Sequence, residues 1–219
     1  MAHFVDDLEL RRQLEGEDEY GAGKLQVEEM LVEKNAWCLR LPDVYGPFDE
    51  MRFWKYFLWL SVADKFPVFV QNNRELSFVY SEDVAKCICI AITQCVPTER
   101  PRGATNVGDA RRLTLKDFLL LYAKCAGFKH EIKFCNDPKS DVWPEEFLPS
   151  VDYAIKVEKL LRQLPQFNPT PMEEGLSQMS SFYRRAYDKY PKEREEVISE
   201  FPKQFHSLIR RRAIELADE

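Results

Sequence analysis

The chain has 219 residues, enough for one domain with a sizeable hydrophobic core, and its apolar fraction of 45% excludes a wholly disordered protein. No apolar run approaches the ~20 residues of a membrane-spanning helix, and the net charge of −6 argues against a general nucleic-acid binder. Six cysteines without zinc or disulfide-framework spacing indicate free thiols in a reducing compartment, so we expect a cytoplasmic protein with no metal site and no membrane contact.

The N-terminal segment, residues 1–19, is acidic. Seven Asp and Glu residues stand against two arginines, Arg11 and Arg12. The segment lacks the basic and apolar regions of a signal peptide, and no amphipathic period is sustained along it. We therefore predict a loop or a frayed helix here.

A tyrosine and a lysine, Tyr20 and Lys24, stand four residues apart at the start of a predicted helix over 21–33. This spacing puts both side chains on one helical face. An ammonium beside a phenol favours the phenolate that proton transfer requires. Taken alone, the same spacing is also typical of a solvated helix face.

A predicted strand and its following loop come next. The apolar run over 37–41 has the length of a buried parallel strand. Residues 42–47 form the loop at its carboxyl end, where ligands bind in open α/β sheets. The next predicted helix, 51–65, carries an apolar stripe typical of packing on a core or on a second copy of the chain. The stripe consists of Trp54, Phe57, Leu58 and Val62.

Farther along, short apolar runs predict strands, and longer amphipathic runs with capping residues predict helices. The predicted strands are 68–70, 78–80, 104–107 and an edge strand over 129–135. The predicted helices are 81–94 with Ser81 as N-cap, 114–126 with Thr114 as N-cap and a stop at Gly127, 151–164 and 172–190.

The last segment, residues 186–219, is a charged extension. Its apolar stripe predicts a helix that docks on the body of the protein or on a partner. Acidic residues are interspersed with the arginines of 210–212, which makes a basic ligand patch the less favoured interpretation. The stripe consists of Ile198, Phe201, Phe205, Leu208 and Ile209.

Five short signatures occur in a fixed order along the chain. They are YGAGK at 20–24, LPDVYGP at 41–47, LSFVYSEDVA at 76–85, ATNVG at 104–108 and LTLKDF at 113–118. Together they resemble the carboxyl-terminal part of an extended short-chain dehydrogenase/reductase, the NAD(P)-dependent epimerase/dehydratase family. The resemblance covers roughly residues 18–185.

The resemblance implies an α/β fold class: a partial Rossmann-type parallel sheet with a small carboxyl-terminal α/β substrate domain and an extra terminal helix. It divides the chain into the acidic segment 1–19, an epimerase/dehydratase-like domain over 20–185 and the helical extension 186–219.

The resemblance also implies site residues and a cofactor, NAD or NADP. Tyr20 corresponds to the general acid/base and Lys24 to the residue that binds the nicotinamide ribose. The loop implied to lie beside the nicotinamide consists of Leu41, Pro42, Asp43 and Val44.

Two positions are implied to bind substrate, Asp43 and Arg74. Many nucleotide-sugar enzymes of the family carry Asn at the position of Asp43, whereas a carboxylate can only accept hydrogen bonds and repels a diphosphate. Such enzymes also often carry a phosphate-clamping arginine where this chain has Leu76, and Arg74 is the residue that could replace it.

Two features of the family are not found in these residues. No GxxGxxG turn follows an apolar run, and the first serine and threonine are Ser61 and Thr93, far beyond Tyr20. Two hypotheses stay open. One is an NAD(P)-dependent epimerase, dehydratase or reductase, truncated here, that acts on a small-molecule substrate. The other is a non-catalytic scaffold or regulatory subunit that retains the carboxyl half of the fold. The expected partners are a second copy, through the helix of Tyr20 and Lys24, or an obligate partner that covers the open sheet.

Overall fold

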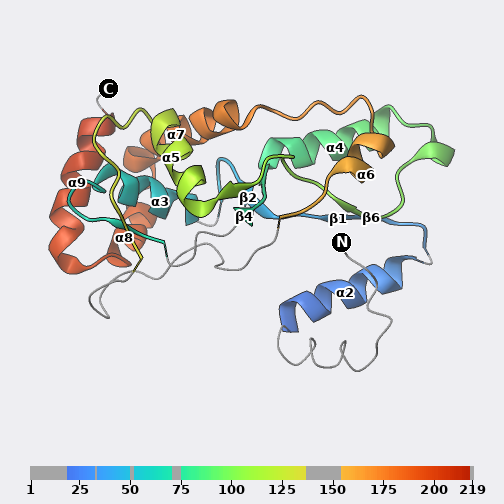
Figure 1. Cartoon of the computed structure of the whole chain (residues 1–219), viewed down its shortest axis with the longest axis horizontal. Helices are drawn as coiled ribbons and strands as arrows, with labels where there is room; N and C mark the ends of the chain where they lie inside the picture. Colours follow the sequence, from blue (N-terminus) through green and yellow to red (C-terminus); the bar gives the residue numbers. More distant parts are fainter. Residues whose placement is uncertain (1–18, 33, 50–51, 71–74, 137–153, 218–219) are drawn as a thin grey trace.

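The computed structural model describes residues 19–32, 34–49, 52–70, 75–136 and 154–217 (Figure 1). The elements in chain order are α2 (Glu19–Val32), β1 (Trp37–Arg40), β2 (Asp43–Tyr45), α3 (Arg52–Ser61), β3 (Val68–Phe69), β4 (Glu75–Leu76), β5 (Phe78–Tyr80), α4 (Ser81–Thr93), the 3-10 helix η1 (Pro97–Glu99), β6 (Gly103–Asn106), β7 (Leu113–Thr114), α5 (Leu115–Cys125), β8 (Phe134–Cys135), α6 (Glu158–Gln163), α7 (Met172–Lys189), α8 (Pro191–Ser199) and α9 (Lys203–Ala217).

The strands form short ladders, most of them parallel. β1 pairs with β6, β2 with β5 and β3 with β8, all in parallel, and β4 pairs with β7 in the antiparallel sense. Only two residues separate β1 from β2 along the chain. The β1–β6 ladder is therefore followed directly by the β2–β5 ladder. The expected α/β class with a partial Rossmann-like sheet is therefore confirmed.

Two groups of elements stand at opposite ends of the molecule. Figure 1 shows α3, α7, α8 and α9 gathered at one end, and the β1–β6 pair with α4 and α6 at the other. Helix α2 lies beside this second end, where it contacts β6. The candidate catalytic helix is thus carried by the sheet and stands away from the helical cluster.

The main core is built from aromatic side chains of α3, α5 and α7. All four members of the predicted stripe on α3 and its continuation are buried. The ring of Phe118 on α5 is fully buried and stacks on Phe78 of β5 with ring centroids 3.8 Å apart. A smaller cluster around Cys87 and Leu160 fills the space between α4, α6 and the sheet. Aromatic stacking of this kind adds to the stabilisation from buried area.

The carboxyl-terminal extension docks on the body of the protein. We expected one helix, and the structure has two, α8 and α9, because Pro202 lies between them and cannot continue a helix. Phe205 stacks on Phe66 at 3.9 Å between centroids, and Phe201 meets Trp59 edge-on at 6.0 Å. The stripe predicted from the sequence is therefore the face that packs on α3 and its following turn.

Three further predicted elements differ from the structure. The loop predicted over 42–47 contains β2, a strand of three residues that is too short for its period to be recognised. The helix predicted over 151–164 is α6 alone; residues 151–153 lie outside the described part, and the backbone N–H of Ile155 donates to Ser77 Oγ instead of joining the helix. The edge strand predicted over 129–135 is reduced to β8.

The predicted caps are half right. Thr114 caps α5, since its side chain accepts from the backbone N–H of Asp117, and Gly127 follows the helix with φ +76°. Ser81 is the first residue of α4 and not its N-cap, which is Tyr80 without a side-chain cap. The strand β5 runs directly into α4, and this leaves no separate capping residue.

Gly175 lies where α7 closely approaches Tyr45 of β2. A Cβ at this position would lie 2.8 Å from Tyr45 Oη and 3.0 Å from Tyr45 Cε2, and Tyr45 is held by neighbouring rings. We expect Gly175→Ala to lower the free energy of unfolding by about 1–3 kcal/mol, since overpacking outweighs the gain in helix propensity. Denaturant unfolding measures the change. The matched control is Gly23→Ala on α2, where nothing lies within 4 Å, and which should be neutral or stabilising by about 1 kcal/mol.

Candidate functional site

A bidentate ion pair ties α2 to the sheet. Arg40, the last residue of β1, donates from Nε to Glu28 Oε1 at 2.7 Å and from Nη2 to Glu28 Oε2. A two-bond carboxylate–guanidinium contact fixes orientation as well as distance. Because Leu41 follows Arg40 directly, this ion pair sets the position of α2 relative to the loop after β1.

Tyr20 and Lys24 lie together on one face of α2. Lys24 Nζ stands 5.1 Å from the centroid of the Tyr20 ring, a cation–π arrangement. The Tyr20 side chain is 76% exposed, so its hydroxyl is open to a ligand. The expectation that the two side chains share a helical face is therefore confirmed in geometry, while their catalytic role stays a prediction.

A cleft of about 570 Å³ brings Tyr20 to the loop after β1. Its volume falls in the range of small-molecule sites. Residues from α2, the β1–β2 segment, the turn before α3 and the start of α4 line it: Tyr20, Leu41, Pro42, Asp43, Val44, Tyr45, Gly46, Pro47, Phe48, Asp49, Arg52 and Ser81. Five of the six residues implied for catalysis and cofactor binding thus share one cleft. The sixth, Lys24, is adjacent through its contact with Tyr20, and Arg74 lies outside the described residues.

Asp43 is buried in the wall of this cleft and pairs with Arg52. Only 8% of the Asp43 side chain is exposed, and Oδ1 accepts from Arg52 Nη1. Burial raises the pKa of Asp43, and the Arg52 guanidinium opposes that rise. Among the described residues, Oδ2 is buried without a hydrogen-bond partner. The carboxylate predicted to repel anions is therefore charge-compensated within the chain.

Asp49 fixes the turn that leads into α3. Its Oδ2 accepts from the backbone N–H of Phe53 at 2.8 Å, and its Oδ1 accepts from the buried Tyr183 hydroxyl of α7. Burial raises the pKa of Asp49, and these hydrogen bonds oppose the rise. Asp49 thus connects the start of α3 to α7 and keeps Arg52, the first residue of α3, at the cleft.

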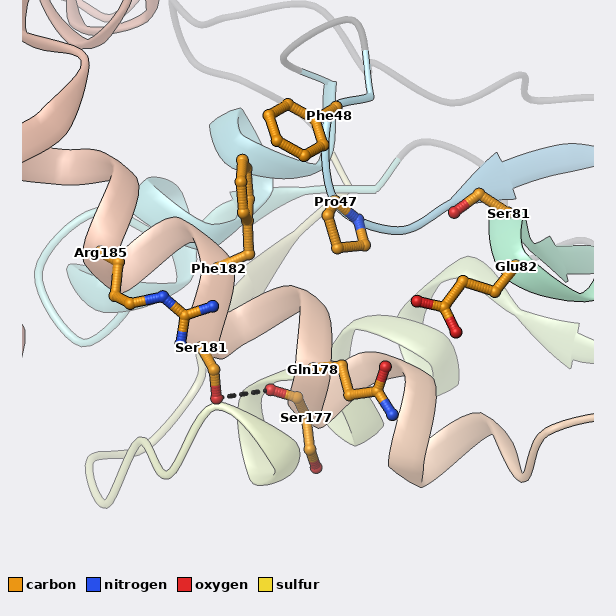
Figure 2. A pocket seen from close by; sticks show the side chains of 9 residues that line it. All are labelled: Pro47, Phe48, Ser81, Glu82, Ser177, Gln178, Ser181, Phe182 and Arg185. Atoms are coloured by element: carbon orange, nitrogen blue, oxygen red, sulfur yellow. Dashed lines mark hydrogen bonds between the residues drawn. The ribbon is translucent and has the colours of Figure 1, made fainter.

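A second pocket of about 650 Å³ adjoins the cleft and shares Pro47, Phe48 and Ser81 with it. Figure 2 shows Phe48 and Phe182 on one side, Glu82 on the other and Arg185 reaching in from α7. The rings of Phe48 and Phe182 lie 4.4 Å apart between centroids. Phe48 is 77% exposed and has φ 64°, a backbone region that non-glycine residues adopt at a cost. Phe48 therefore presents its exposed ring to both pockets.

Sequence reasoning missed Arg52, Asp49 and Phe48. Phe48 and Asp49 lie in the turn between β2 and α3, Arg52 is the first residue of α3, and all three follow the signature that ends at Pro47. The sequence carries no signal for Arg52, because its ion pair with Asp43, nine residues earlier, is visible only in the tertiary structure.

Three general expectations concern the chain as a whole. Within the described ranges, no cluster of three or more His, Cys, Asp or Glu side chains could hold a metal ion. No described helix combines the length and the apolar character needed to cross a bilayer. The six cysteines are free thiols.

The comparisons with known proteins agree with the fold. Residues 6–108 match the NAD dependent epimerase/dehydratase family. No curated protein matches the chain. Similar solved structures include UDP-glucose 4-epimerase from Thermotoga maritima with UDP-glucose, at 18% identity and TM-score 0.53 over 76% of this chain and 52% of that one.

Two further structures extend the comparison. UDP-glucuronic acid 4-epimerase from Bacillus cereus in complex with NAD is similar at 19% identity and TM-score 0.56, over 78% of this chain and 53% of that one. A GDP-L-fucose synthetase from Naegleria fowleri is similar at 13% identity and TM-score 0.51, over 77% of this chain and 53% of that one. The chain thus spans about half the length of these solved structures, and the likeness concerns the fold. The match of residues 6–108 to the NAD dependent epimerase/dehydratase family and the likeness to these solved structures identify a partial Rossmann-like epimerase fold.

Proposed function

We propose that this chain forms the acid/base and substrate side of an NAD(P)-dependent epimerase/dehydratase that acts on a hydroxyl or carbonyl substrate. The observation that carries the proposal is the meeting of Tyr20, with Lys24 over its ring, and the segment 41–44 at one cleft. Such a reaction requires, beside the nicotinamide, a group that transfers a proton, a cation that stabilises its charge and a segment of backbone that packs against the cofactor.

The cleft fits one end of NAD(P). A phenol and an ammonium suit the nicotinamide and its ribose, and the cleft has room for that half of the cofactor. The 219 residues contain no GxxGxxG turn for the pyrophosphate. We propose that Tyr20, Lys24 and residues 41–44 hold the nicotinamide–ribose half. The bound cofactor supplies a hydride acceptor.

The work of this chain is proton transfer and electrostatic support. The exposed Tyr20 side chain, as its phenolate, takes the proton of the substrate hydroxyl while the hydride of the same carbon passes to the cofactor, and the resulting phenol returns the proton in the reverse step. The Lys24 ammonium, 5.1 Å from the ring centroid, stabilises the negative charge that Tyr20 carries before it takes the proton and again after it has returned it. The Glu28–Arg40 ion pair keeps α2 in register with the loop after β1.

A protein partner and a location complete the proposal. Val27 and Met30 on α2 are 52% and 70% exposed, so α2 presents apolar surface that a second copy of the chain or an obligate partner can cover. The free thiols favour a reducing compartment, and we propose the cytoplasm.

A second candidate is a non-catalytic scaffold or regulatory subunit. The observation that favours it is the exposed apolar surface of α2 at Val27 and Met30, which a protein partner can cover. Such a protein keeps the fold and the side chains of the cleft without turnover.

Product analysis separates the two candidates. The purified chain is incubated with NAD⁺ or NADP⁺ and a panel of nucleotide sugars and free sugars, and epimers or dehydrated products are identified by NMR. Turnover that Tyr20→Phe abolishes supports the enzyme. A chain that binds the nicotinamide–ribose half yet turns over none of the panel, alone or with a nucleotide-binding half of the family added, supports the scaffold.

The Glu28–Arg40 ion pair provides a positioning test. We expect Glu28→Gln to lower kcat/KM by about tenfold, because small displacements of a catalytic group are costly. The unfolding midpoint should fall modestly, since this partly buried pair with two hydrogen bonds stabilises the fold by about 1–2 kcal/mol. The charge-swapped double variant, Glu28→Arg with Arg40→Glu, should recover most of the rate. Unchanged kcat/KM in the single variant contradicts the positioning role.

A further inference from the structure

The charges at the cleft are arranged in two layers. The two carboxylates are turned away from solvent: the Asp43 side chain is 8% exposed, and the two oxygens of Asp49 accept hydrogen bonds from Phe53 and Tyr183. The Arg52 guanidinium is nearer to solvent, since 40% of the Arg52 side chain is exposed while its acidic partner is buried. A ligand that enters the cleft therefore meets the guanidinium before it meets either carboxylate.

Arg52 retains donors for a ligand. Nη1 donates to Asp43, and among the described residues the other N–H groups of the guanidinium have no hydrogen-bond partner. A guanidinium presents five donors in a planar fork that matches carboxylate and phosphate oxygens. Asp43 offers one oxygen to Arg52 and keeps the other buried, so it orients the fork without occupying it.

We propose that Arg52 binds an oxyanion of the substrate, a phosphate or a carboxylate, and that Asp43 is the residue that positions it. The inference rests on the proposed function in one respect, that the anionic ligand is the substrate of the reaction. Arg52 lines the same cleft as Tyr20, so one ligand can place its anionic group on Arg52 and its reacting hydroxyl at Tyr20. Lys24, beside Tyr20, adds a second cation near the cleft, which also favours an anionic ligand.

Ligand binding without cofactor tests the inference. Isothermal titration of the full chain compares UDP with uridine, and glucuronate with glucose; the first pair reports phosphate and the second carboxylate. We expect at least one anionic member to bind at least tenfold more tightly than its neutral counterpart, and this preference to shrink about tenfold in Arg52→Gln. The loss of one charge-assisted contact of about 1.4 kcal/mol gives such a factor.

Two further variants make the outcome independent of folding. Arg52→Gln leaves Asp43 buried without its cation, so the pair is also removed as Asp43→Asn with Arg52→Gln, which leaves no buried charge. Arg111→Gln is the matched control, because Arg111 has a similar exposure, 39%, pairs with Asp109 and Glu173, and lines neither pocket. The control should keep the preference for the anion.

The outcomes separate this inference from the proposed function. Loss of the anion preference in both Arg52 variants and its retention in Arg111→Gln support Arg52 as the oxyanion site, whether or not the chain turns over a substrate. Equal binding of charged and neutral probes by the unaltered chain, or a preference that survives the double variant, overturns it. A missing turnover with intact anion binding counts against the proposed function alone.

Discussion

Tyr20→Phe should abolish turnover while leaving the fold untouched. Removal of the hydroxyl takes away the group that exchanges the proton, and general acid–base catalysis contributes about 10²–10⁴ in rate. Because the Tyr20 side chain is 76% exposed, we expect the free energy of unfolding to change by less than about 0.5 kcal/mol. Steady-state kinetics and denaturant unfolding on the same preparation measure the two quantities.

The chain offers a matched control for this substitution. Tyr190 also has a lysine over its ring, with Lys189 Nζ 5.5 Å from the centroid, and it lies at the end of α7, away from the cleft. Tyr190→Phe should retain full activity. If Tyr20→Phe turned over substrate as fast as this control, Tyr20 would not be the acid/base.

Phe118→Ala should cause the largest loss of stability. Its fully buried ring stacks on Phe78 and meets Tyr45 and Phe53, so that the truncation opens a cavity between α5 and the sheet. Burial of an aromatic ring in such a site corresponds to about 3–5 kcal/mol. Urea unfolding should show a lower midpoint with an unchanged slope.

Leu120 provides the control on the same helix. It is 40% exposed, and Leu120→Ala should cost less than about 1 kcal/mol. A loss at Phe118 no larger than the loss at Leu120 would mean that α5 does not pack on β5 as described.

The sequence predicted the parts of the fold in which a hydrophobic pattern repeats over several turns or a capping residue is clear. The stripe on α3 and the capping of α5 by Thr114 were correct because each depends on neighbouring residues in one helix. The missed strands, β2, β4 and β7, have two or three residues each and exist through their partners. The start of α6 was wrong because Ile155 forms a tertiary hydrogen bond with Ser77.

The candidate site was predictable to the same extent. The signatures at 20–24 and 41–47 located Tyr20, Lys24 and Asp43, and the structure brings these segments to one cleft. The pairing of Asp43 with Arg52 was not predictable, because the turn between β2 and α3 has no periodic pattern. The sequence alone therefore could not show that the Asp43 carboxylate is charge-compensated by Arg52.

The most direct test of the central claim is a fluorescence titration with reduced nicotinamide mononucleotide, the half of the cofactor that the cleft is proposed to hold. We predict saturable binding that weakens about tenfold in Lys24→Met, the variant that removes the ammonium beside Tyr20, and that is unchanged in Lys189→Met. Absence of saturable binding, or equal affinity in the two variants, would contradict a nicotinamide site at Tyr20 and Lys24.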